Sequence, residues 1–344
     1  MRVLLIKTSS MGDVIHTLPA ITDAYKAIPG IQFDWVVEEG FAEIPGWHPA
    51  VSEVIPVALR RWRKNWRSAE TRAAWRALRA RLNERQYDLV LDAQGLVKSA
   101  FVAFFAKGAR AGLDWQSARE SLASLIYQQH HKVNFYQHAI LRMRQLFSQA
   151  LGYGLPDSPP DGGLNRMQFQ QGARAQEKYV VFLHGTTWES KLWPETYWMQ
   201  LAALAASAGY RVKISGASEE EIARASRIAD YCPAVDLVPR LTIAQMARLL
   251  AAAVAAVAVD TGFGHLSAAL DVPTVSLYGP TNPEYTGALG KHSVHLTASF
   301  PCAPCLNRVC TYQGESLVQP ACFSALTPEQ VWRALMALRP VHPD

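Results

Sequence analysis

Short apolar runs alternate with longer stretches of helical character along the chain. In the first half this pattern predicts strands at Val3–Lys7, Phe33–Val37 and Leu89–Asp92, a helix over Ile15–Ala27 and another from Val97. Strands that alternate with helices form a parallel sheet with helices on both faces. The pattern therefore predicts an α/β fold built on doubly wound sheets.

The alternation is interrupted once and then resumes. Leu155–Gly172 contains three prolines and a pair of glycines, the composition of a linker. At 344 residues the chain also exceeds what one hydrophobic core usually serves. We predict two Rossmann-like domains, at 1–165 and 175–326, and a C-terminal helix and tail at 327–344. The further elements expected are strands at Tyr179–Leu183, Arg211–Ser215 and Thr274–Tyr278 and helices over Glu195–Ala208, Glu219–Ala229, His265–Leu270 and Thr327–Leu338.

Each predicted domain begins with a strand that runs into a polar loop, Lys7–Asp13 in the first and His184–Lys191 in the second. Ligands of doubly wound sheets lie beyond the carboxyl ends of the strands. Two such domains facing each other would direct both loops into one cleft, where we expect the functional site.

The composition is that of a folded protein, since 49% of the residues are hydrophobic and only 18% are charged. The longest apolar run, Leu249–Val259, is shorter than the roughly 18 to 20 residues that span a bilayer. The opening MRVLLI is too short for a signal-peptide core, so we expect a cytoplasmic protein.

Positive charge is concentrated in one segment. Between Arg60 and Arg81 nine Lys or Arg stand against one acid, Glu70, which gives +8 in a chain whose net charge is +5. If the start of this segment is helical, Arg60, Arg63, Lys64 and Arg67 share one face. Tryptophans lie between them. The segment predicts a polyanionic partner, which could be nucleic acid, an anionic membrane surface or an acidic substrate.

A second unit of the pattern is suited to an anion. Ala251–Val259 reads as a strand, Asp260 to Gly264 as a tight loop, and a helix is expected from His265. Glycines let a backbone approach a ligand closely, and the amides that open a helix carry partial positive charge. Asp260, Thr261, Gly262 and His265 are therefore candidates for lining a nucleotide site.

The polar loop of the second predicted domain adds three candidates, Thr186, Thr187 and Lys191. Their two hydroxyls and one ammonium can hold a diphosphate. The alternative is that Lys191 is only a surface residue, as loop lysines often are. Glu221 lies in the first turn of a predicted helix. An acid at this position is explained either by its favourable interaction with the helix dipole or by a contact to ribose hydroxyls. No Asp-x-Asp occurs to hold a bridging metal ion. The first loop also lacks Gly-x-Gly-x-x-Gly, which disfavours nicotinamide enzymes and Walker-type ATPases.

Asp13 ends the first polar loop and has two interpretations. Its carboxylate can cap the following helix by accepting from backbone amides. It can also act as a general base that takes a proton from a substrate hydroxyl.

Four of the five cysteines, Cys302, Cys305, Cys310 and Cys322, lie within 21 residues. A Cys-x-x-Cys pair followed by two more thiols can form a tetrahedral zinc site. The second pair has irregular spacing, which equally fits small buried thiols that pin a proline-rich loop.

The chain resembles glycosyltransferase family 9, the heptosyltransferases with the GT-B fold, over nearly its whole length. The matching segments are VLLIKTSSMGDVIHTLPA, FDWVVEEGFAEIP, RRWRK at 60–64, LDAQGLVKSA at 91–100, FLHGTTWESKLWP and VDTGFGHLSAALDVPTVSLYGPTNP. The resemblance implies an inverting enzyme of lipopolysaccharide inner-core synthesis. It would transfer L-glycero-D-manno-heptose from ADP-heptose to the first 3-deoxy-manno-octulosonic acid (Kdo) of Kdo-lipid A, with no cofactor or metal in the chemical step.

The resemblance also implies roles for single residues and for the domains. The first domain would bind the acceptor and the second the nucleotide sugar, peripherally at the cytoplasmic face of the inner membrane and without nucleic acid. Asp13 would be the catalytic base, helped by Lys191. The implied donor contacts are Thr186, Thr187, Lys191, Glu221, Asp260, Thr261, Gly262 and His265, and the implied acceptor contacts are Arg60, Arg61, Arg63 and Lys64.

Three alternatives stay open on the sequence. A family member could add a later core heptose rather than the first. A non-catalytic protein could use Arg60–Arg81 to bind anionic lipid or nucleic acid. A nucleotide-sugar epimerase could share the two-domain scaffold.

Overall fold

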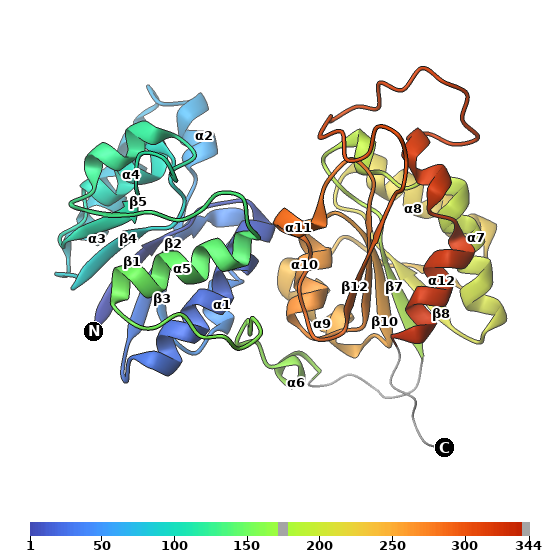
Figure 1. The fold of residues 1–344 in the computed structure, drawn as a ribbon, viewed down its shortest axis with the longest axis horizontal. Coiled ribbons are helices and arrows are strands. Elements are labelled where there is room, and N and C mark those ends of the chain that lie inside the picture. The colour runs from blue at the N-terminus through green and yellow to red at the C-terminus, as the bar shows by residue number, and fades with distance from the viewer. Residues whose placement is uncertain (171–177, 339–344) are drawn as a thin grey trace. The chain divides into compact units, whose positions relative to one another are not determined.

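The computed structural model describes residues 1–170 and 178–338, which form two compact units divided between Leu164 and Asn165 (Figure 1). The last residues of the expected linker, the first three of the domain predicted at 175–326 and the end of the tail at 339–344 lie outside the described residues. The roles predicted for the two domains stay predictions.

The first unit contains one parallel sheet of six strands with helices on both faces. Its strand order is β3-β2-β1-β4-β5-β6, so the order reverses between β1 and β4. Its strands are β1 (Arg2–Ile6), β2 (Gln32–Glu38), β3 (Val51–Val57), β4 (Leu89–Asp92), β5 (Arg110–Leu113) and β6 (Gln129–His131), and its α-helices are α1 (Met11–Ala27), α2 (Leu59–Lys64), α3 (Ala69–Asn83), α4 (Val97–Phe104) and α5 (Ala139–Leu151).

The second unit repeats this architecture. Its strand order is β9-β8-β7-β10-β11-β12. If its strands are counted from β7 as the first, this order is the same as that of the first sheet, and the reversal lies between β7 and β10. Its strands are β7 (Tyr179–Leu183), β8 (Arg211–Ile214), β9 (Val235–Leu237), β10 (Ala255–Val259), β11 (Thr274–Tyr278) and β12 (Ser293–Thr297), and its α-helices are α6 (Arg166–Phe169), α7 (Glu195–Ser207), α8 (Glu219–Tyr231), α9 (Ile243–Ala252), α10 (Gly262–Ala269), α11 (Pro283–Thr286) and α12 (Pro328–Ala337).

Each sheet is held by its own core. In the first unit, side chains of β1 and β4 such as Leu4 and Val90 pack against Leu78 and Leu82 of α3 and Val102 of α4. In the second unit α7, α8 and α12 pack on one face, and the expected C-terminal helix belongs to this core. Because parallel strands buried on both faces are mostly apolar, β1, β4, β7, β10 and β11 read as nearly continuous apolar runs.

Three predicted elements differ from the observed ones by more than two residues at one end. The first helix begins at Met11 rather than Ile15, because Ser10 and Asp13 form a capping box. Helix α10 begins at Gly262 rather than His265. The apolar run Leu249–Val259 is divided between the end of α9 and β10. Among the described helices, none combines the length and apolar character needed to span a bilayer.

Candidate active site

The first polar loop lies at the edge where the strand order of the first unit reverses. Gln94 follows β4, and its Oε1 accepts hydrogen bonds from the amides of Thr8, at 3.0 Å, and Ser9, at 3.2 Å. Lys7 is buried and donates to the carbonyl of Ala93 at 3.0 Å. The loops after β1 and β4 are thus joined at the position where doubly wound sheets bind ligands.

Asp13 has a capping role in this structure, but as the third residue of α1 and not from a position before the helix, where its first interpretation placed it. Its Oδ2 accepts from the amide of Ser10 at 2.6 Å and from the Ser10 hydroxyl at 2.9 Å. The side chain is only partly buried. Because both bonds use Oδ2, capping leaves the base interpretation open, and that role stays a prediction.

Positive side chains surround Asp13, although they come from distant parts of the chain. Burial lowers the pKa of Lys7, and the charge of Asp13 opposes this while Arg142 and Arg119 add to it. The pKa of Arg142 is lowered in the same way by burial and by Arg119, and raised by Asp13. Lys7 and Arg142 therefore lie within electrostatic range of Asp13, and Arg119 lies within range of these two cations. Such a group of cations can attract an anionic substrate to the carboxylate.

The second polar loop lies at the matching edge of the second unit. The Nζ of Lys191 forms an ion pair with Oδ2 of Asp260 at 2.7 Å, and both side chains are largely buried. The Thr186 hydroxyl donates to the Asp260 carbonyl at 3.2 Å, and Thr281 donates to Oδ2 at 2.8 Å. The loops after β7 and β10 are therefore also joined. The Nε2 of His265 lies 3.8 Å from Asp260 Oδ1, so this junction brings together four of the predicted donor residues, Thr186, Lys191, Asp260 and His265.

Lys191 keeps a defined orientation. Besides Asp260, its ammonium lies 4.4 Å from the centre of the Trp188 ring. An ammonium has three donors, so an ion pair with one carboxylate leaves capacity for a phosphate oxygen. The loop thus holds a cation in place instead of exposing a mobile lysine.

The start of α10 corrects one expectation. The amides of Gly264 and His265 already bond to the Thr261 carbonyl, at 3.0 and 3.3 Å, so the amides that open the helix are those of Gly262 and Phe263. Gly264 also has a packing reason, because a Cβ there would lie 3.0 Å from the Ala258 side chain. The amides available to an anion therefore lie three residues earlier than predicted.

Glu221 and Thr187 lie at the same edge of the second sheet, but Glu221 is held by hydrogen bonds whereas Thr187 is exposed. Oε2 of Glu221 accepts from the Ala217 amide at 2.8 Å as part of the capping box with Ser218. Oε1 lies beside Gly185, where an added Cβ would approach it to 2.5 Å, so only glycine lets the loop after β7 pass the acid. Thr187 is exposed. Whether either contacts a nucleotide stays a prediction.

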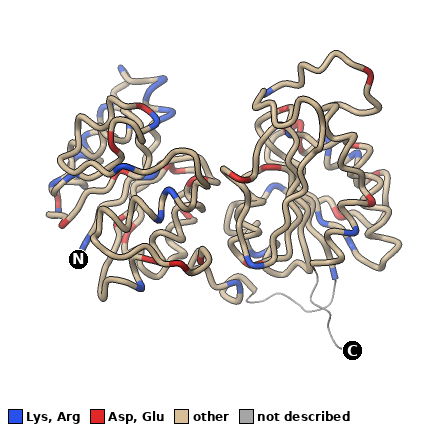
Figure 2. Tube along the Cα trace, in the orientation of Figure 1, with Lys and Arg blue, Asp and Glu red and all other residues tan. Residues whose placement is uncertain are grey.

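The basic segment is more divided than the sequence indicated. Figure 2 shows Lys and Arg concentrated on α2 and α3. Arg60, Arg61, Arg63 and Lys64 are exposed on α2, but this helix ends at Lys64, so the predicted shared face with Arg67 is wrong. The fold also brings acids near, because Glu39 pairs with Arg61 at 3.0 Å.

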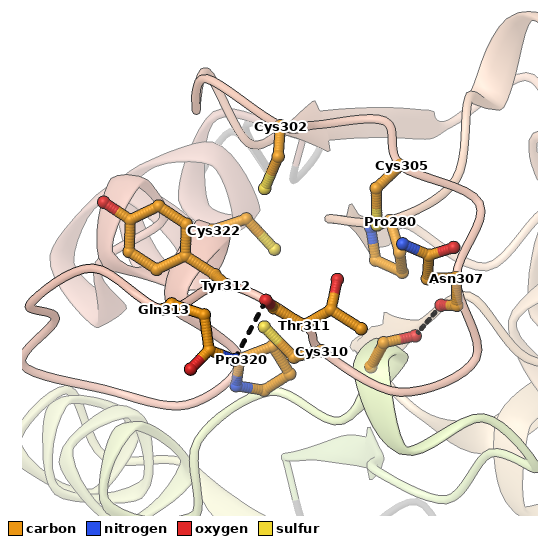
Figure 3. Close-up of a pocket in the computed structure, with 11 residues that line it drawn as sticks. Pro280, Cys302, Cys305, Asn307, Cys310, Thr311, Tyr312, Gln313, Pro320 and Cys322 are labelled. Carbon is orange, nitrogen blue, oxygen red and sulfur yellow. Dashed lines mark hydrogen bonds between the residues drawn. The ribbon is translucent and has the colours of Figure 1, made fainter.

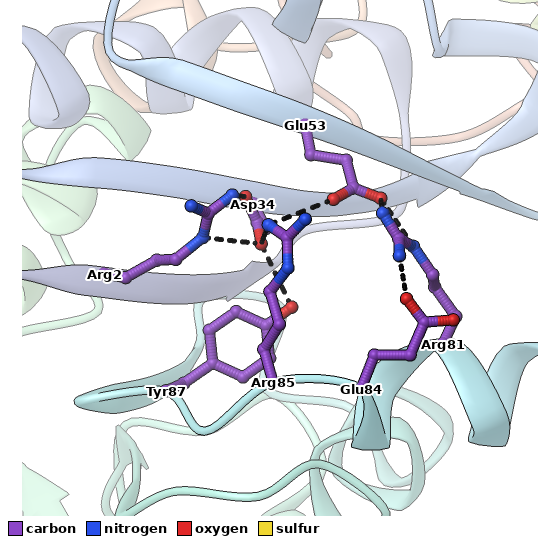
Figure 4. Close-up of polar contacts among 7 residues, drawn as sticks. All are labelled: Arg2, Asp34, Glu53, Arg81, Glu84, Arg85 and Tyr87. Atoms are coloured by element: carbon purple, nitrogen blue, oxygen red, sulfur yellow. Dashed lines mark hydrogen bonds and ion pairs between the residues drawn. The ribbon is translucent and has the colours of Figure 1, made fainter.

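At the C-terminal end of the basic segment, the arginines form ion pairs within the first unit. Arg81 pairs with Glu53 and Glu84, and Arg85 lies 3.5 Å from both Asp34 and Glu53 (Figure 4). Asp34 is fully buried and also accepts from Arg2 and from Tyr87. Arg81 is thus paired with one acid of β3 and with Glu84, which directly follows α3, so it adds little to the exposed cationic surface.

Aromatic side chains join the basic helices into one surface. Trp75 of α3 contacts Trp62 of α2 and Phe101 of α4, with ring centres 5.3 and 5.4 Å apart. Phe101 and Phe104 are about half exposed, and the guanidinium of Arg110 lies over the Phe104 ring. Leu122 and Leu125 of the short helix packed beside α4 are exposed as well. Apolar and cationic groups therefore share one face.

The four clustered cysteines line one cavity of about 260 Å³ in the second unit (Figure 3). All are free thiols. Burial, with smaller contributions from Cys302, Cys310 and Cys305, raises the pKa of Cys322 to about 12, so each of the other three thiols lies within electrostatic range of Cys322. Among the residues described, no three His, Cys, Asp or Glu side chains are already placed as ligands of a metal ion.

Some candidate residues were missed by sequence reasoning. Gln94 and Thr281 each follow a buried strand, a position that could have identified them. Arg142 and Arg119 could not have been found, because they come from a helix and a loop more than 100 residues after Asp13, and only the fold brings Arg142 near Asp13 and Arg119 near Lys7. The expectation that the two polar loops share one cleft stays a prediction.

Comparisons with known proteins extend over both units. A sequence model described as "Glycosyltransferase family 9 (heptosyltransferase)" matches residues 75–315. The chain is 56% identical to lipopolysaccharide heptosyltransferase 1 of Pseudomonas aeruginosa, with 98% of each chain covered. The solved structure of E. coli heptosyltransferase WaaC with ADP is similar at a TM-score of 0.88 and 45% identity, covering 98% of this chain and all of that one. A structure of WaaC with ADP-2-deoxy-2-fluoro heptose gives a TM-score of 0.85 at 44% identity, with 98% and 99% covered.

Proposed function

The chain belongs to glycosyltransferase family 9, and on this basis we propose that it transfers L-glycero-D-manno-heptose from ADP-heptose to the first Kdo of Kdo-lipid A. The reaction is a step of lipopolysaccharide inner-core synthesis. The 56% identical relative carries the name heptosyltransferase 1, which favours the first heptose over a later one.

The observation that carries this proposal is the junction of Thr186, Lys191 and Asp260 where the second sheet reverses its strand order. A buried ammonium beside the amides that open α10 offers two sources of positive charge for a diphosphate. The similar WaaC structures contain ADP and an ADP-heptose analogue, ligands that such a junction suits.

We assign the donor to this edge of the second unit. Lys191 and the hydroxyls of Thr186 and Thr187 bind the diphosphate, and Thr261, Gly262 and His265 complete its surroundings at the start of α10. Asp260 orients Lys191 through the ion pair instead of contacting phosphate, because two anions would repel. Glu221 accepts from the ribose hydroxyls through Oε1, since Oε2 serves the cap.

Asp13 is the proposed general base. It takes the proton of the attacking Kdo hydroxyl while that oxygen bonds to the anomeric carbon, and the bond from that carbon to the diphosphate oxygen breaks. ADP leaves with the electron pair and is stabilised by Lys191. Attack from the face opposite the nucleotide inverts the anomeric centre.

We assign the acceptor to the first unit. Kdo-lipid A carries carboxylates and phosphates, and Arg60, Arg61, Arg63 and Lys64 present exposed cations for them. Lys98 extends this group, since Arg60 and Arg63 act electrostatically on it. Arg142, which lies within electrostatic range of Asp13, and Arg119, which lies within range of Arg142, would hold the sugar carboxylate next to the base.

We also propose a cytoplasmic location with peripheral binding to the inner face of the inner membrane. The exposed Phe101, Phe104, Leu122 and Leu125 lie beside cations, a combination that suits the headgroup region of an anionic bilayer. Sedimentation with anionic vesicles should be reduced by Phe101→Ser with Phe104→Ser and unchanged by Tyr231→Ser, which alters an equally exposed aromatic of the second unit. Equal loss in both variants would contradict this face.

The decisive test of the activity uses purified protein, ADP-heptose and Kdo-lipid A. We expect ADP release together with a glycolipid heavier by one heptose, measured by coupled assay and mass spectrometry. ADP release without a heavier lipid would indicate hydrolysis. Transfer only to a lipid that already carries heptose would instead support the later step of the core.

A further inference from the structure

The cysteine segment lies between β12 and α12 and contains no strand or α-helix. Cys302, Cys305 and Cys310 belong to its irregular part, and Cys322 lies buried in a short 3-10 helix, Ala321–Ala325. Such a segment has few backbone bonds of its own to fix its shape. Nevertheless, in Figure 3 the four sulfur atoms project from different parts of the segment into one cavity.

The same segment supports the loop that carries Lys191. The amide of Ser190 donates to the Arg308 carbonyl at 3.0 Å, and its buried hydroxyl donates to the Asn307 carbonyl at 2.5 Å. The Arg308 guanidinium also lies 5.6 Å from the centre of the Trp188 ring, on which the Lys191 ammonium rests. Residues between Cys305 and Cys310 therefore hold the residue adjacent to Lys191.

A second contact ties the segment to the end of β11. The amide of Leu306 donates to the Pro280 carbonyl at 2.8 Å, and Pro280 lines the cysteine cavity. Thr281, the next residue, donates to Asp260. Both members of the Lys191–Asp260 pair are thus connected through one or two residues to the segment that contains the thiols.

We propose that Cys302, Cys305, Cys310 and Cys322 bind one thiophilic divalent metal ion, Zn²⁺ or Fe²⁺, and that this ion fixes the segment that positions Lys191. Four cysteine side chains are the ligand set of closed structural sites for these ions. Each thiol releases its proton when it binds the ion as a thiolate. With four protein ligands no coordination position is left for water, so the ion takes no part in the transfer reaction.

Binding requires the thiols to draw closer together than they are here, because ligands of one zinc ion lie about 2.3 Å from it. Cys302, Cys305 and Cys310 lie in residues without helix or strand structure, so they can move toward the buried Cys322 without breaking a sheet or a helix. The cavity already contains all four sulfur atoms and has room for an ion.

Elemental analysis of the purified full-length protein tests the site without any activity measurement. After purification without metal resin and gel filtration in metal-free buffer, we expect about one equivalent of zinc or iron per chain. The double variant Cys302→Ser with Cys305→Ser should lose most of it. Cys232→Ser is the matched control, since it removes the one other thiol, which is buried at the end of α8 outside the cavity, and should keep the metal.

Three results would overturn the proposal. The first is less than about half an equivalent of zinc and iron in wild-type protein even after growth with both metals supplied. The second is equal metal content in the double variant and the wild type. The third is a non-reduced mass that shows disulfides among the four thiols. The first and third use wild-type protein, so they hold even where a variant fails to fold.

The positioning part rests on the proposed function and needs its own readout. Removing the metal with a chelator should raise the KM for ADP-heptose by about tenfold, the equivalent of one charge-assisted hydrogen bond, and leave the KM for the acceptor unchanged. A fall in kcat with an unchanged donor KM would contradict positioning of Lys191. If the protein has no transferase activity at all, the elemental analysis still decides the metal site.

Discussion

The two units have the same strand order. They differ in the charged residues that lie at the sheet edge where this order reverses. In the first unit, the loop after β1 runs into the first turn of α1, where Asp13 lies within electrostatic range of Lys7 and Arg142. In the second unit, the loop after β7 contains Lys191, which is paired with Asp260. The first edge thus presents an acid near two cations, and the second presents a cation held by an acid.

This difference matches two tasks that one fold can support. A base must be reached by the hydroxyl of an anionic acceptor, and cations around it draw that acceptor in. A diphosphate site needs a cation with a fixed direction, which a buried ion pair provides. The comparison therefore teaches that the sheet supplies the position, while the residues of the two joined loops decide the chemistry.

The largest expected effect is a loss of turnover when the acid of the first edge is removed. Asp13→Ala should lower kcat by about 10²- to 10⁴-fold, the usual contribution of a general base, and leave ADP-heptose binding nearly unchanged. Steady-state kinetics and calorimetry measure the two quantities. Because Asp13 also caps α1, Ser10→Ala is the matched control. It removes the partner hydroxyl and keeps the carboxylate, so it should cost about 1 kcal/mol of stability with normal turnover.

A second test compares one buried histidine in each unit. Burial lowers the pKa of His48 and of His184 to about 4. The Nδ1 of His48 accepts from the Ala50 amide, and Nδ1 of His184 is buried without a hydrogen-bond partner among the described residues, so neither ring has a place for a second proton.

The sign of the pH dependence follows from these lowered pKa values. Unfolded histidine binds a proton near pH 6.5, so the stabilisation is present above that pH and is lost as pH falls toward about 4. Each ring should contribute a loss on the order of 3 kcal/mol in the free energy of unfolding. Urea unfolding of wild type, His48→Gln and His184→Asn across this range measures it. An unchanged pH slope in both variants would refute the assignment.

The third test concerns the cation of the second edge. Lys191→Ala should raise the KM for ADP-heptose by roughly 10- to 100-fold, because a charge-assisted bond to phosphate is worth about 1.5 to 3 kcal/mol. The acceptor KM should not change. Lys291→Ala is the control, since this lysine is exposed in the same unit and paired with Asp271. A larger change for the acceptor than for the donor would move Lys191 to the other substrate.

The smallest effect is expected from the exposed cations of α2. Replacing Arg60, Arg61 and Lys64 by alanine should raise the acceptor KM several-fold, and the difference should shrink as salt increases, because exposed charges contribute about 0 to 1 kcal/mol each. The matched control replaces three exposed cations of the second unit. These are Arg248, Lys291 and Arg333. A changed donor KM in the α2 variant would contradict its assignment to the acceptor.

Local sequence was sufficient to predict much of the fold and some of the site. The apolar runs predicted β1, β4, β7 and β11 to within one or two residues, because buried parallel strands have no polar face to obscure them. The start of α10 was placed three residues late, because Asp-Thr-Gly-Phe-Gly has the composition of a loop, whereas the helix already begins at Gly262. The shared face of Arg60 and Arg67 was wrong because nothing in the residues marks the end of α2.

By itself, the sequence determined two doubly wound units, the residues that follow their first strands, and a cluster of thiols. These are local properties, set by hydrophobic period and by the position of polar residues at strand ends. Tertiary structure alone decided that Asp260 holds Lys191, that Arg142 lies near Asp13, and that the cysteine segment supports Ser190. Such pairings depend on where parallel strands place distant loops, because the order of strands in a sheet is not the order of the chain.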